Sequence, residues 1–253
     1  MTEFSYQLYS SRNFPPLADT LAMLKHAGYR NVEGYGGVYG DLAGLKKGLG
    51  DNGLAMPTGH FGIDMLEKEQ DRVLEIAQTL GMKAIYCPYL QEEFRPSGAA
   101  GWRAFGERLQ KAGEPYRKAG YIFGWHNHDF EFQPLPDGSV PQQLIFEAAP
   151  DLSWEADIAW IIRGGGDALK WIAAYGDRIT AVHVKDIAPV GENADEDGWA
   201  DVGHGTIDWA DIMKALHKTQ VEYLIMEHDN PGDAERFATR SLETAKRLWA
   251  AAH

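Results

Sequence analysis

Cysteine is nearly absent from this chain, since Cys87 is the only one among 253 residues. A lone cysteine cannot form an internal disulfide, which favours a reducing compartment. Cys87 lies in an apolar run directly before Pro88, where we expect a buried, inert thiol rather than a nucleophile. The sequence contains no Gly-x-Ser-x-Gly pattern either, so nothing in it supports nucleophilic hydrolysis.

Basic residues are also scarce: 24 Lys and Arg face 37 Asp and Glu, which leaves a net charge of -13. This balance argues against nucleic acid as the main partner, because neutralising phosphates requires clustered cations. An anionic small ligand stays possible, since one local Lys or Arg can bind it. No apolar run approaches the roughly 18 residues of a membrane span, and residues 1–14 lack the basic start and apolar stretch of a leader. We therefore expect a soluble cytoplasmic protein without a membrane partner.

Short apolar runs alternate with amphipathic stretches at intervals of roughly 25 to 35 residues. Eight strands alternating with helices, without a linker, predict one (β/α)8 TIM-barrel domain over residues 1–253. An open doubly wound sheet is less favoured, because residues 10–14 read Ser-Ser-Arg-Asn-Phe where its Gly-rich loop would stand. The expected strands are 5–9, 31–34, 55–59, 84–88, 122–126, 152–157, 181–185 and 224–227. The expected helices are 15–26, 64–80, 101–119, 209–216 and 234–251.

One long loop is expected at residues 188–205, which are rich in Gly, Asp, Glu and Asn. A loop of this length at the rim of a barrel is typical of a lid or a binding loop. A disordered acidic surface loop is the alternative.

Clusters of histidines and acids follow four of the expected strands, at residues 126–131, 155–157, 183–186 and 227–229. In a closed parallel barrel these positions converge on one rim. Side chains alternate along a strand, so Glu155 and Asp157 share a face, as do His183 and Lys185. Burying such groups without partners costs roughly several kcal/mol each, so we expect a bound metal or a mutually paired network. A paired structural charge is the alternative for any single residue.

The mixture of imidazoles and carboxylates, without thiolates, suits Mn²⁺, Mg²⁺, Co²⁺ or Zn²⁺. Such a cation would polarise a substrate carbonyl or hydroxyl and acidify the adjacent atom, and nearby bases would then move the proton. An enzyme is therefore the leading interpretation.

Five segments carry a resemblance to a known family: residues 124–132, 155–160, 183–186, 203–209 and 226–229. Through them the chain resembles the xylose isomerase-like TIM barrels over essentially its whole length. This group contains sugar-phosphate isomerases and epimerases, ketose 3-epimerases, hydroxypyruvate isomerases, inosose and 3-dehydroshikimate dehydratases and endonuclease IV enzymes. The resemblance implies a small polyhydroxylated carbonyl substrate and a homodimer or homotetramer.

The resemblance also implies a metal held by an acid from the fifth strand, an Asp from the sixth, a His from the seventh and a Glu from the eighth. Asp157, His183 and Glu227 match the last three positions. Glu227 is expected to act as an acid/base group as well, and manganese is the expected ion.

The fifth strand departs from the family pattern, because His126 stands where most epimerases have the Glu. Glu131 is the nearest carboxylate that could swing back to the metal, and we favour it as the fourth ligand, since His126 and His128 are then free as acid/base groups. His126 is the alternative ligand. This departure argues against symmetric epimerisation by two glutamates. The resemblance leaves two reactions open, an isomerase or epimerase and a dehydratase or lyase, which share proton abstraction beside a polarised carbonyl.

Other residues at strand ends are expected to contact substrate: Glu33, His60, Lys185 and Glu155. A surface carboxylate, a loop histidine and a structural ion pair are the alternatives for Glu33, His60 and Lys185. An endonuclease is disfavoured by the acidic balance. A non-catalytic carbohydrate-binding barrel is a more distant alternative, which absence of any divalent metal from the purified protein would support.

Overall fold

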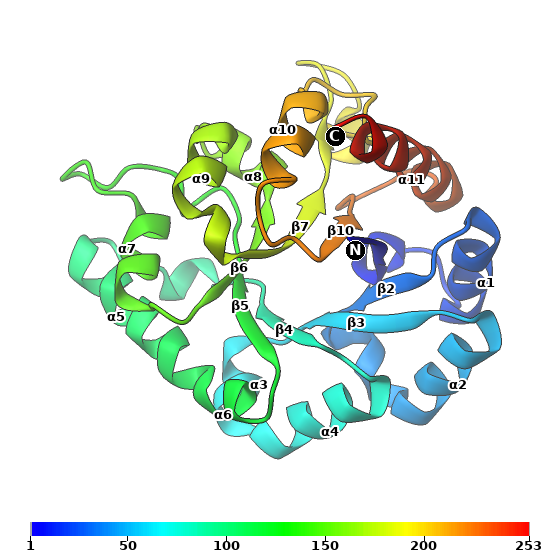
Figure 1. Cartoon of the computed structure of the whole chain (residues 1–253), viewed down its shortest axis with the longest axis horizontal. Coiled ribbons are helices and arrows are strands. Elements are labelled where there is room, and N and C mark those ends of the chain that lie inside the picture. Colours follow the sequence, from blue (N-terminus) through cyan, green and yellow to red (C-terminus); the bar gives the residue numbers. More distant parts are fainter. Residues whose placement is uncertain (1, 253) are drawn as a thin grey trace.

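The computed structural model describes residues 2–252 and shows a closed barrel of parallel strands surrounded by helices (Figure 1). Within these residues the barrel has eight strands, in the order β1-β10-β7-β6-β5-β4-β3-β2. The expected (β/α)8 fold is confirmed, and each of the eight expected strands is present, although the strand expected at 5–9 ends at Gln7 because Leu8–Ser11 form a 3-10 helix. The strands are β1 (Glu3–Gln7), β2 (Asn31–Gly34), β3 (Ala55–His60), β4 (Ala84–Cys87), β5 (Ile122–His126), β6 (Ser153–Asp157), β7 (Ile179–Val184) and β10 (Tyr223–Met226).

The helices cover the outside of the barrel, and two expected long helices are wrong as single elements. The expected 64–80 helix breaks at Glu69, whose φ of -129° is not helical, and the expected 101–119 helix breaks at Gly113. Four helices were not expected, among them α2, whose three glycines weaken the helical pattern. The helices are α1 (Leu17–Ala27), α2 (Leu42–Asn52), α3 (Ile63–Lys68), α4 (Gln70–Leu80), α5 (Ala99–Ala112), α6 (Glu114–Lys118), α7 (Pro141–Ala148), α8 (Ile158–Arg163), α9 (Ala168–Tyr175), α10 (Trp209–Leu216) and α11 (Ala234–Ala251).

The buried apolar side chains form two separate clusters. The larger one lies between the strands and the surrounding helices. The smaller one fills the inside of the barrel, because its residues share the inward face of their strands with His183 and Glu227. It consists of Ala84, Tyr86, Ala181, Tyr223 and Ile225. With the lower part of the barrel filled in this way, inward polar groups gather near the carboxyl ends of the strands.

The loop expected at 188–205 is folded rather than irregular. Strands β8 (Asp186–Ile187) and β9 (Trp199–Ala200) pair antiparallel and enclose a short 3-10 helix at Ala194–Glu196. Arg236 of α11 holds this hairpin, with its Nη2 at 2.8 Å from Oε2 of Glu196 and its Nε at 3.0 Å from Oδ2 of Asp201. The disordered alternative is therefore wrong. Separately, none of the helices in residues 2–252 combines the length and the apolar character of a membrane span.

Candidate metal and catalytic site

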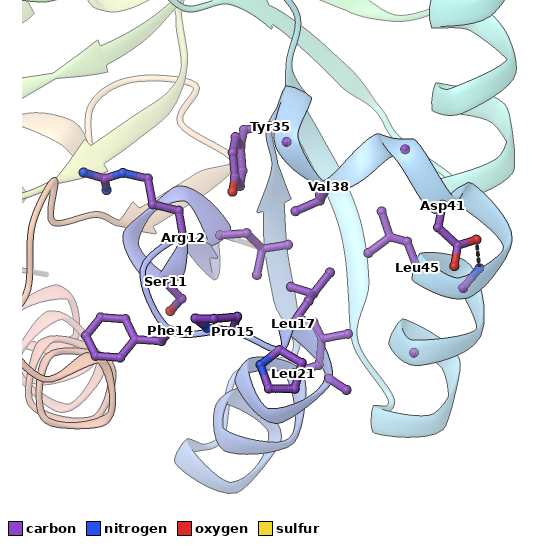
Figure 2. A pocket seen from close by; sticks show the side chains of 17 residues that line it. Ser11, Arg12, Phe14, Pro15, Leu17, Leu21, Tyr35, Val38, Asp41 and Leu45 are labelled. Carbon is purple, nitrogen blue, oxygen red and sulfur yellow. Dashed lines mark hydrogen bonds between the residues drawn. The ribbon is translucent and has the colours of Figure 1, made fainter.

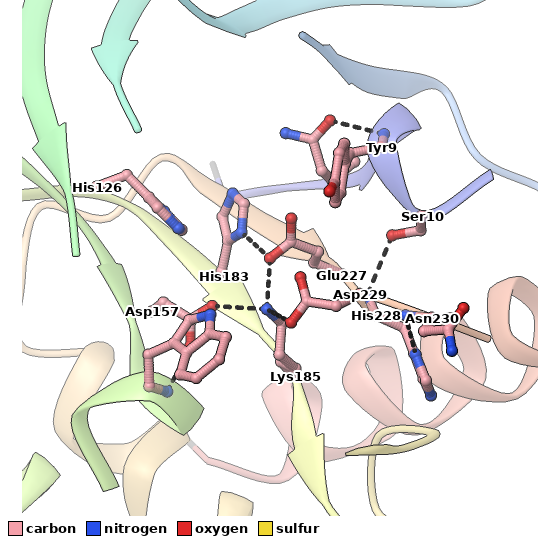
Figure 3. A network of polar contacts seen from close by, with 12 residues as sticks. Tyr9, Ser10, His126, Asp157, His183, Lys185, Glu227, His228, Asp229 and Asn230 are labelled. Carbon is pink, nitrogen blue, oxygen red and sulfur yellow. Dashed lines mark hydrogen bonds and ion pairs between the residues drawn. The ribbon is translucent and has the colours of Figure 1, made fainter. Parts of the chain in front are cut away.

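The carboxyl ends of β5, β6, β7 and β10 bring the predicted side chains to one place. The strand register pairs Asp157 with His183 and His126 with Glu155, so neighbouring strands present these groups side by side. Figure 3 shows His126, Asp157, His183, Lys185 and Glu227 pointing toward one another. The convergence expected for a closed barrel is thus present.

Four of these residues form a group suited to a metal ion: His126, Asp157, His183 and Glu227. Each offers one ligand atom, and the four atoms lie within 4.8 Å of one another. All four side chains are buried, and Nδ1 of His183 lies 2.8 Å from Oε2 of Glu227. Nδ1 of His126 and Oδ2 of Asp157 make no hydrogen bond. Each has only a longer charged contact, His126 Nδ1 at 3.2 Å from Oε2 of Glu155 and Asp157 Oδ2 at 3.3 Å from Nζ of Lys185, so a divalent cation would give both buried atoms a closer partner.

Lys185 supplies a fixed positive charge to the same group. Its Nζ lies 2.8 Å from Glu227 Oε2, 2.9 Å from Asp229 Oδ2 and 3.3 Å from Asp157 Oδ2. Burial opposes the charge, but the three acids raise the pKa of Lys185 above its ordinary value. Three carboxylates outweigh one ammonium, and a divalent cation would balance the remaining charge. The donor set and the charge therefore both fit a divalent metal.

A second layer lies deeper in the barrel and shares His126 and His183 with the first group. His60, Glu155, His126 and His183 also place ligand atoms within 4.8 Å of one another. Their contacts already pair them internally: His60 Nε2 lies 2.5 Å from Glu155 Oε2, and His183 Nε2 lies 2.7 Å from Glu33 Oε1. Burial and the charge of Glu33 raise the pKa of Glu155, the one carboxylate of this group, to about 8, whereas the first group has two carboxylates that ionise below neutral pH, Asp157 with a pKa of about 6 and Glu227 with a lowered pKa. The first group is therefore the better metal site.

Two acids lie in this deeper layer, Glu33 and Glu155, and their pKa values are shifted in opposite directions. Burial opposes ionisation of Glu33, but His60 and His183 outweigh it and lower its pKa to about 2. Burial and the charge of Glu33 raise the pKa of Glu155 to about 8. Glu33 is further held by Gln7, whose amide donates to Oε1 at 2.8 Å. At neutral pH the layer thus holds one ionised carboxylate and one protonated acid.

A cavity of about 490 Å³ opens above the metal-suited group. Glu227, Asp229, His60, His126 and His128 contribute its polar wall. Burial and the charge of Lys185 lower the pKa of His128 to about 3, so its imidazole is neutral. Aromatic side chains form the remaining wall: Tyr9, Tyr35, Tyr89 and Trp160.

The expected substrate contacts divide between the cavity and the layer below it. His60 lines the cavity. Glu33, Glu155 and Lys185 have no exposed surface and are absent from its lining. The structure therefore brings these three residues to the site but places them beneath it, against the histidines and acids that face the cavity.

Glu131, the favoured fourth ligand, lies outside both groups. Its Oε1 accepts a hydrogen bond from Nε1 of Trp125 at 2.9 Å, and its Oε2 accepts one from the backbone N–H of His128 at 2.9 Å. Its side chain is fully buried, and burial raises its pKa to about 8. The structure thus turns Glu131 toward the loop after β5 and leaves His126, the alternative, among the ligand atoms.

A groove of about 530 Å³ lies between α1 and the segment leading into α2 (Figure 2). It is lined mainly by apolar side chains such as Leu17, Leu21 and Leu45. Its acid, Asp41, accepts from the backbone N–H of Gly44 and begins α2. Because no cluster of titratable groups lines this groove, the smaller cavity over the histidines and acids is the site of interest.

Sequence reasoning did not anticipate several residues of the site. Gln7 contacts Glu33 from the first strand, and Tyr9, Tyr35 and Tyr89 line the cavity. A signal existed, since each tyrosine follows a barrel strand by one or two residues, where a parallel barrel places its rim.

Comparison with known proteins identifies the kind of barrel. The family model described as xylose isomerase-like TIM barrel matches residues 21–248. None of the curated proteins matches this sequence. A sugar phosphate isomerase/epimerase from Parabacteroides distasonis ATCC 8503 has 21% identity and a TM-score of 0.81, covering 100% of this chain and 96% of that one.

Two further solved structures have the same fold. The probable 3-DHS dehydratase AsbF of Bacillus anthracis has 12% identity and a TM-score of 0.74, covering 97% of this chain and 99% of its own. The protein named IOLI, whose structure holds a zinc atom, has 17% identity and a TM-score of 0.73, covering 100% and 99%. At these identities the structural likeness establishes the fold, and the enzymes among the neighbours agree with the expectation of an enzyme.

Proposed function

The chain belongs to the xylose isomerase-like TIM barrel family, and from that premise we propose that it is a divalent-metal-dependent sugar isomerase or epimerase. The proposed reaction abstracts a proton from the carbon next to the carbonyl of a sugar, keto-sugar or sugar phosphate. The observation that carries the proposal is the buried group of His126, Asp157, His183 and Glu227 beneath an open cavity.

The four residues of this group are the proposed ligands, with His126 in place of Glu131. When bound, the cation would polarise the substrate carbonyl and acidify the adjacent carbon. Mn²⁺ is our first choice among Mn²⁺, Mg²⁺, Co²⁺ and Zn²⁺, and the zinc atom in the IOLI structure supports a divalent ion of this kind in such a barrel.

Two residues that face the cavity are proposed to move the proton. Burial opposes ionisation of Glu227, but Lys185 and His183 hold its pKa well below the usual range, so it is an ionised base at neutral pH. His128 is neutral and its Nδ1 has no hydrogen-bond partner, which leaves it able to accept or return a proton. His126 would hold the metal and is thereby withdrawn from this role.

A metal-dependent dehydratase or lyase acting on a keto-sugar or inosose is the second candidate. The position of Glu131 favours it, because symmetric epimerisation needs a second carboxylate from the fifth strand and Glu131 is held by Trp125 and the backbone of His128. In this reaction the same proton abstraction is followed by departure of a hydroxyl or alkoxy group from the neighbouring carbon.

Solvent deuterium exchange tests the proposal. Metal-free protein reloaded with Mn²⁺ is incubated in D₂O with keto-sugars, inososes and sugar phosphates, and each substrate is examined by NMR and mass spectrometry. Deuterium incorporation without elimination supports the isomerase, and incorporation with loss of water or an alcohol supports the lyase. Absence of exchange in every compound would refute both.

A further inference from the structure

The position after β7, where many (β/α)8 barrels bind phosphate, is filled by a carboxylate of the protein itself. Loops after the seventh and eighth barrel strands often present backbone N–H groups to a phosphate. Here Asp186 accepts the backbone N–H groups of Ile187 at 2.9 Å, Gly203 at 2.8 Å and Ile207 at 3.1 Å. These backbone N–H groups therefore already donate to a carboxylate of the protein and are not free to bind a phosphate.

In the loop after β10, the eighth strand of the barrel, a backbone N–H group is likewise bound to a carboxylate of the protein. The backbone N–H of Gly232 donates to Oε1 of Glu196 at 2.9 Å. Arg236, in the first turn of α11 just after this loop, is bound to Glu196 and Asp201. A phosphate placed here would compete with carboxylates that already satisfy both kinds of donor, the backbone N–H and the guanidinium.

The cavity itself offers a phosphate no free cation. Among the residues of 2–252 that line it, the acids are Glu227 and Asp229, and none is a lysine or arginine. Lys185 lies directly beneath, but its side chain is fully buried and its ammonium contacts three carboxylates. An ammonium has three donors, so none is left for a ligand.

Three arginines lie over aromatic rings that line the cavity, but none of the three is itself among the lining residues, and each donates to at least one backbone carbonyl. They cover Tyr9, Tyr89 and Trp160, at 3.9, 5.2 and 5.5 Å from the ring centres. Arg12 bonds the Tyr9 carbonyl at 3.1 Å, Arg95 the Leu90 carbonyl at 3.0 Å, and Arg163 the carbonyls of Asp197 and Gly198 at 2.9 Å each.

Resting on the proposed function, we propose that the substrate is an uncharged polyhydroxylated carbonyl compound without a phosphate group. The aromatic wall of Tyr9, Tyr35, Tyr89 and Trp160 replaces a phosphate anchor, because aromatic faces pack against the C–H surface of a sugar or cyclitol ring. The phosphate named for the Parabacteroides distasonis relative is then not a feature of this chain's substrate.

The test compares each exchanging keto-sugar or inosose with its own phosphate ester, using the Mn²⁺-loaded full chain. We expect kcat/KM for the uncharged form to exceed that for the ester by at least about tenfold, and millimolar inorganic phosphate to leave the rate unchanged. Equal or faster turnover of the ester would overturn the inference while leaving the proposed function intact. No exchange with either form would instead refute the proposed function.

The aromatic wall is tested separately at Tyr89, whose ring lines the cavity and whose hydroxyl accepts from Arg95 at 2.6 Å. Tyr89→Ala removes the ring and the hydroxyl, whereas Tyr89→Phe removes the hydroxyl alone. We expect KM for the uncharged substrate to rise several-fold more in Tyr89→Ala than in Tyr89→Phe, with kcat changing less than KM. Equal effects of the two substitutions on KM would contradict the role of the ring.

Discussion

Nε2 of His183 lies 2.7 Å from Oε1 of Glu33, in the layer beneath the metal-suited group. Glu33 is ionised there, so it accepts the Nε2 proton and fixes the orientation of the imidazole. Nδ1, on the other side of the ring, is thereby directed toward Glu227 and Asp157. We therefore propose that Glu33, expected to contact substrate, acts as a positioning residue.

Replacing Glu33 by glutamine tests this relationship. The amide keeps the shape but loses the charge that holds the Nε2 proton, so Mn²⁺ affinity should fall by about 10- to 100-fold. Isothermal titration of Mn²⁺ into metal-free protein measures the change. Glu75→Gln, on the exposed face of α4, is the matched control and should bind like the parent. Unchanged affinity in Glu33→Gln would assign Glu33 a packing role alone.

The identity of the fourth ligand is tested by substituting the two candidates separately. His126→Ala should reduce metal occupancy sharply, because it removes one of the four grouped ligand atoms. Glu131→Gln should retain one metal per chain, since both oxygens of Glu131 accept hydrogen bonds from Trp125 and the backbone of His128. Metal analysis after dialysis distinguishes the two. If Glu131→Gln lost the metal and His126→Ala kept it, Glu131 would be the fourth ligand instead.

Glu131 also predicts a pH dependence of stability. Its pKa of about 8 in the folded protein lies above its ordinary value, so its stabilising contribution is complete below pH 4 to 5 and is lost as the pH rises toward 8. The slope is at most about 1.4 kcal/mol per pH unit. Urea unfolding between pH 5 and 8 should show a smaller decline for Glu131→Gln than for the parent chain. Parallel pH profiles would contradict the raised pKa.

Lys185 predicts a link between metal binding and stability. Lys185→Met leaves Asp157, Glu227 and Asp229 without their buried cation, and breaking a buried ion pair costs about 3 to 5 kcal/mol. Metal-free Lys185→Met should therefore unfold at a lower temperature than the parent. Saturating Mn²⁺ should raise the midpoint of the variant more than that of the parent, because the metal replaces missing charge. An equal metal-induced shift in both proteins would argue against this charge balance.

The sequence was sufficient to predict the barrel, its strands and the convergence of His126, Asp157, His183 and Glu227, because strand periodicity and closure determine which side chains share a rim. It did not separate the two layers of the site. Whether Glu33 and Glu155 face the cavity or lie below it depends on how deep each residue sits in the barrel, which follows from strand stagger rather than from face alternation.

The role of Glu131 was beyond sequence reasoning for a different reason. A carboxylate five residues after His126 can turn toward the metal or back toward the strand, and the choice depends on how the loop after β5 folds against two nearby donors, Nε1 of Trp125 and the backbone N–H of His128. The commitment of Asp186 to three backbone N–H groups likewise depends on a loop that closes from residues 203–207. Such contacts are set by tertiary packing.

Binding of Mn²⁺ to metal-free protein, compared between the parent chain and Asp157→Ala, tests the central claim most directly. Asp157 lies in the ligand group and has no exposed surface. The account predicts one tightly bound ion per chain in the parent, and neither tight binding nor solvent exchange into substrate in Asp157→Ala, with the barrel's far-ultraviolet circular dichroism preserved. A variant that still binds one Mn²⁺ with the affinity of the parent would contradict the account.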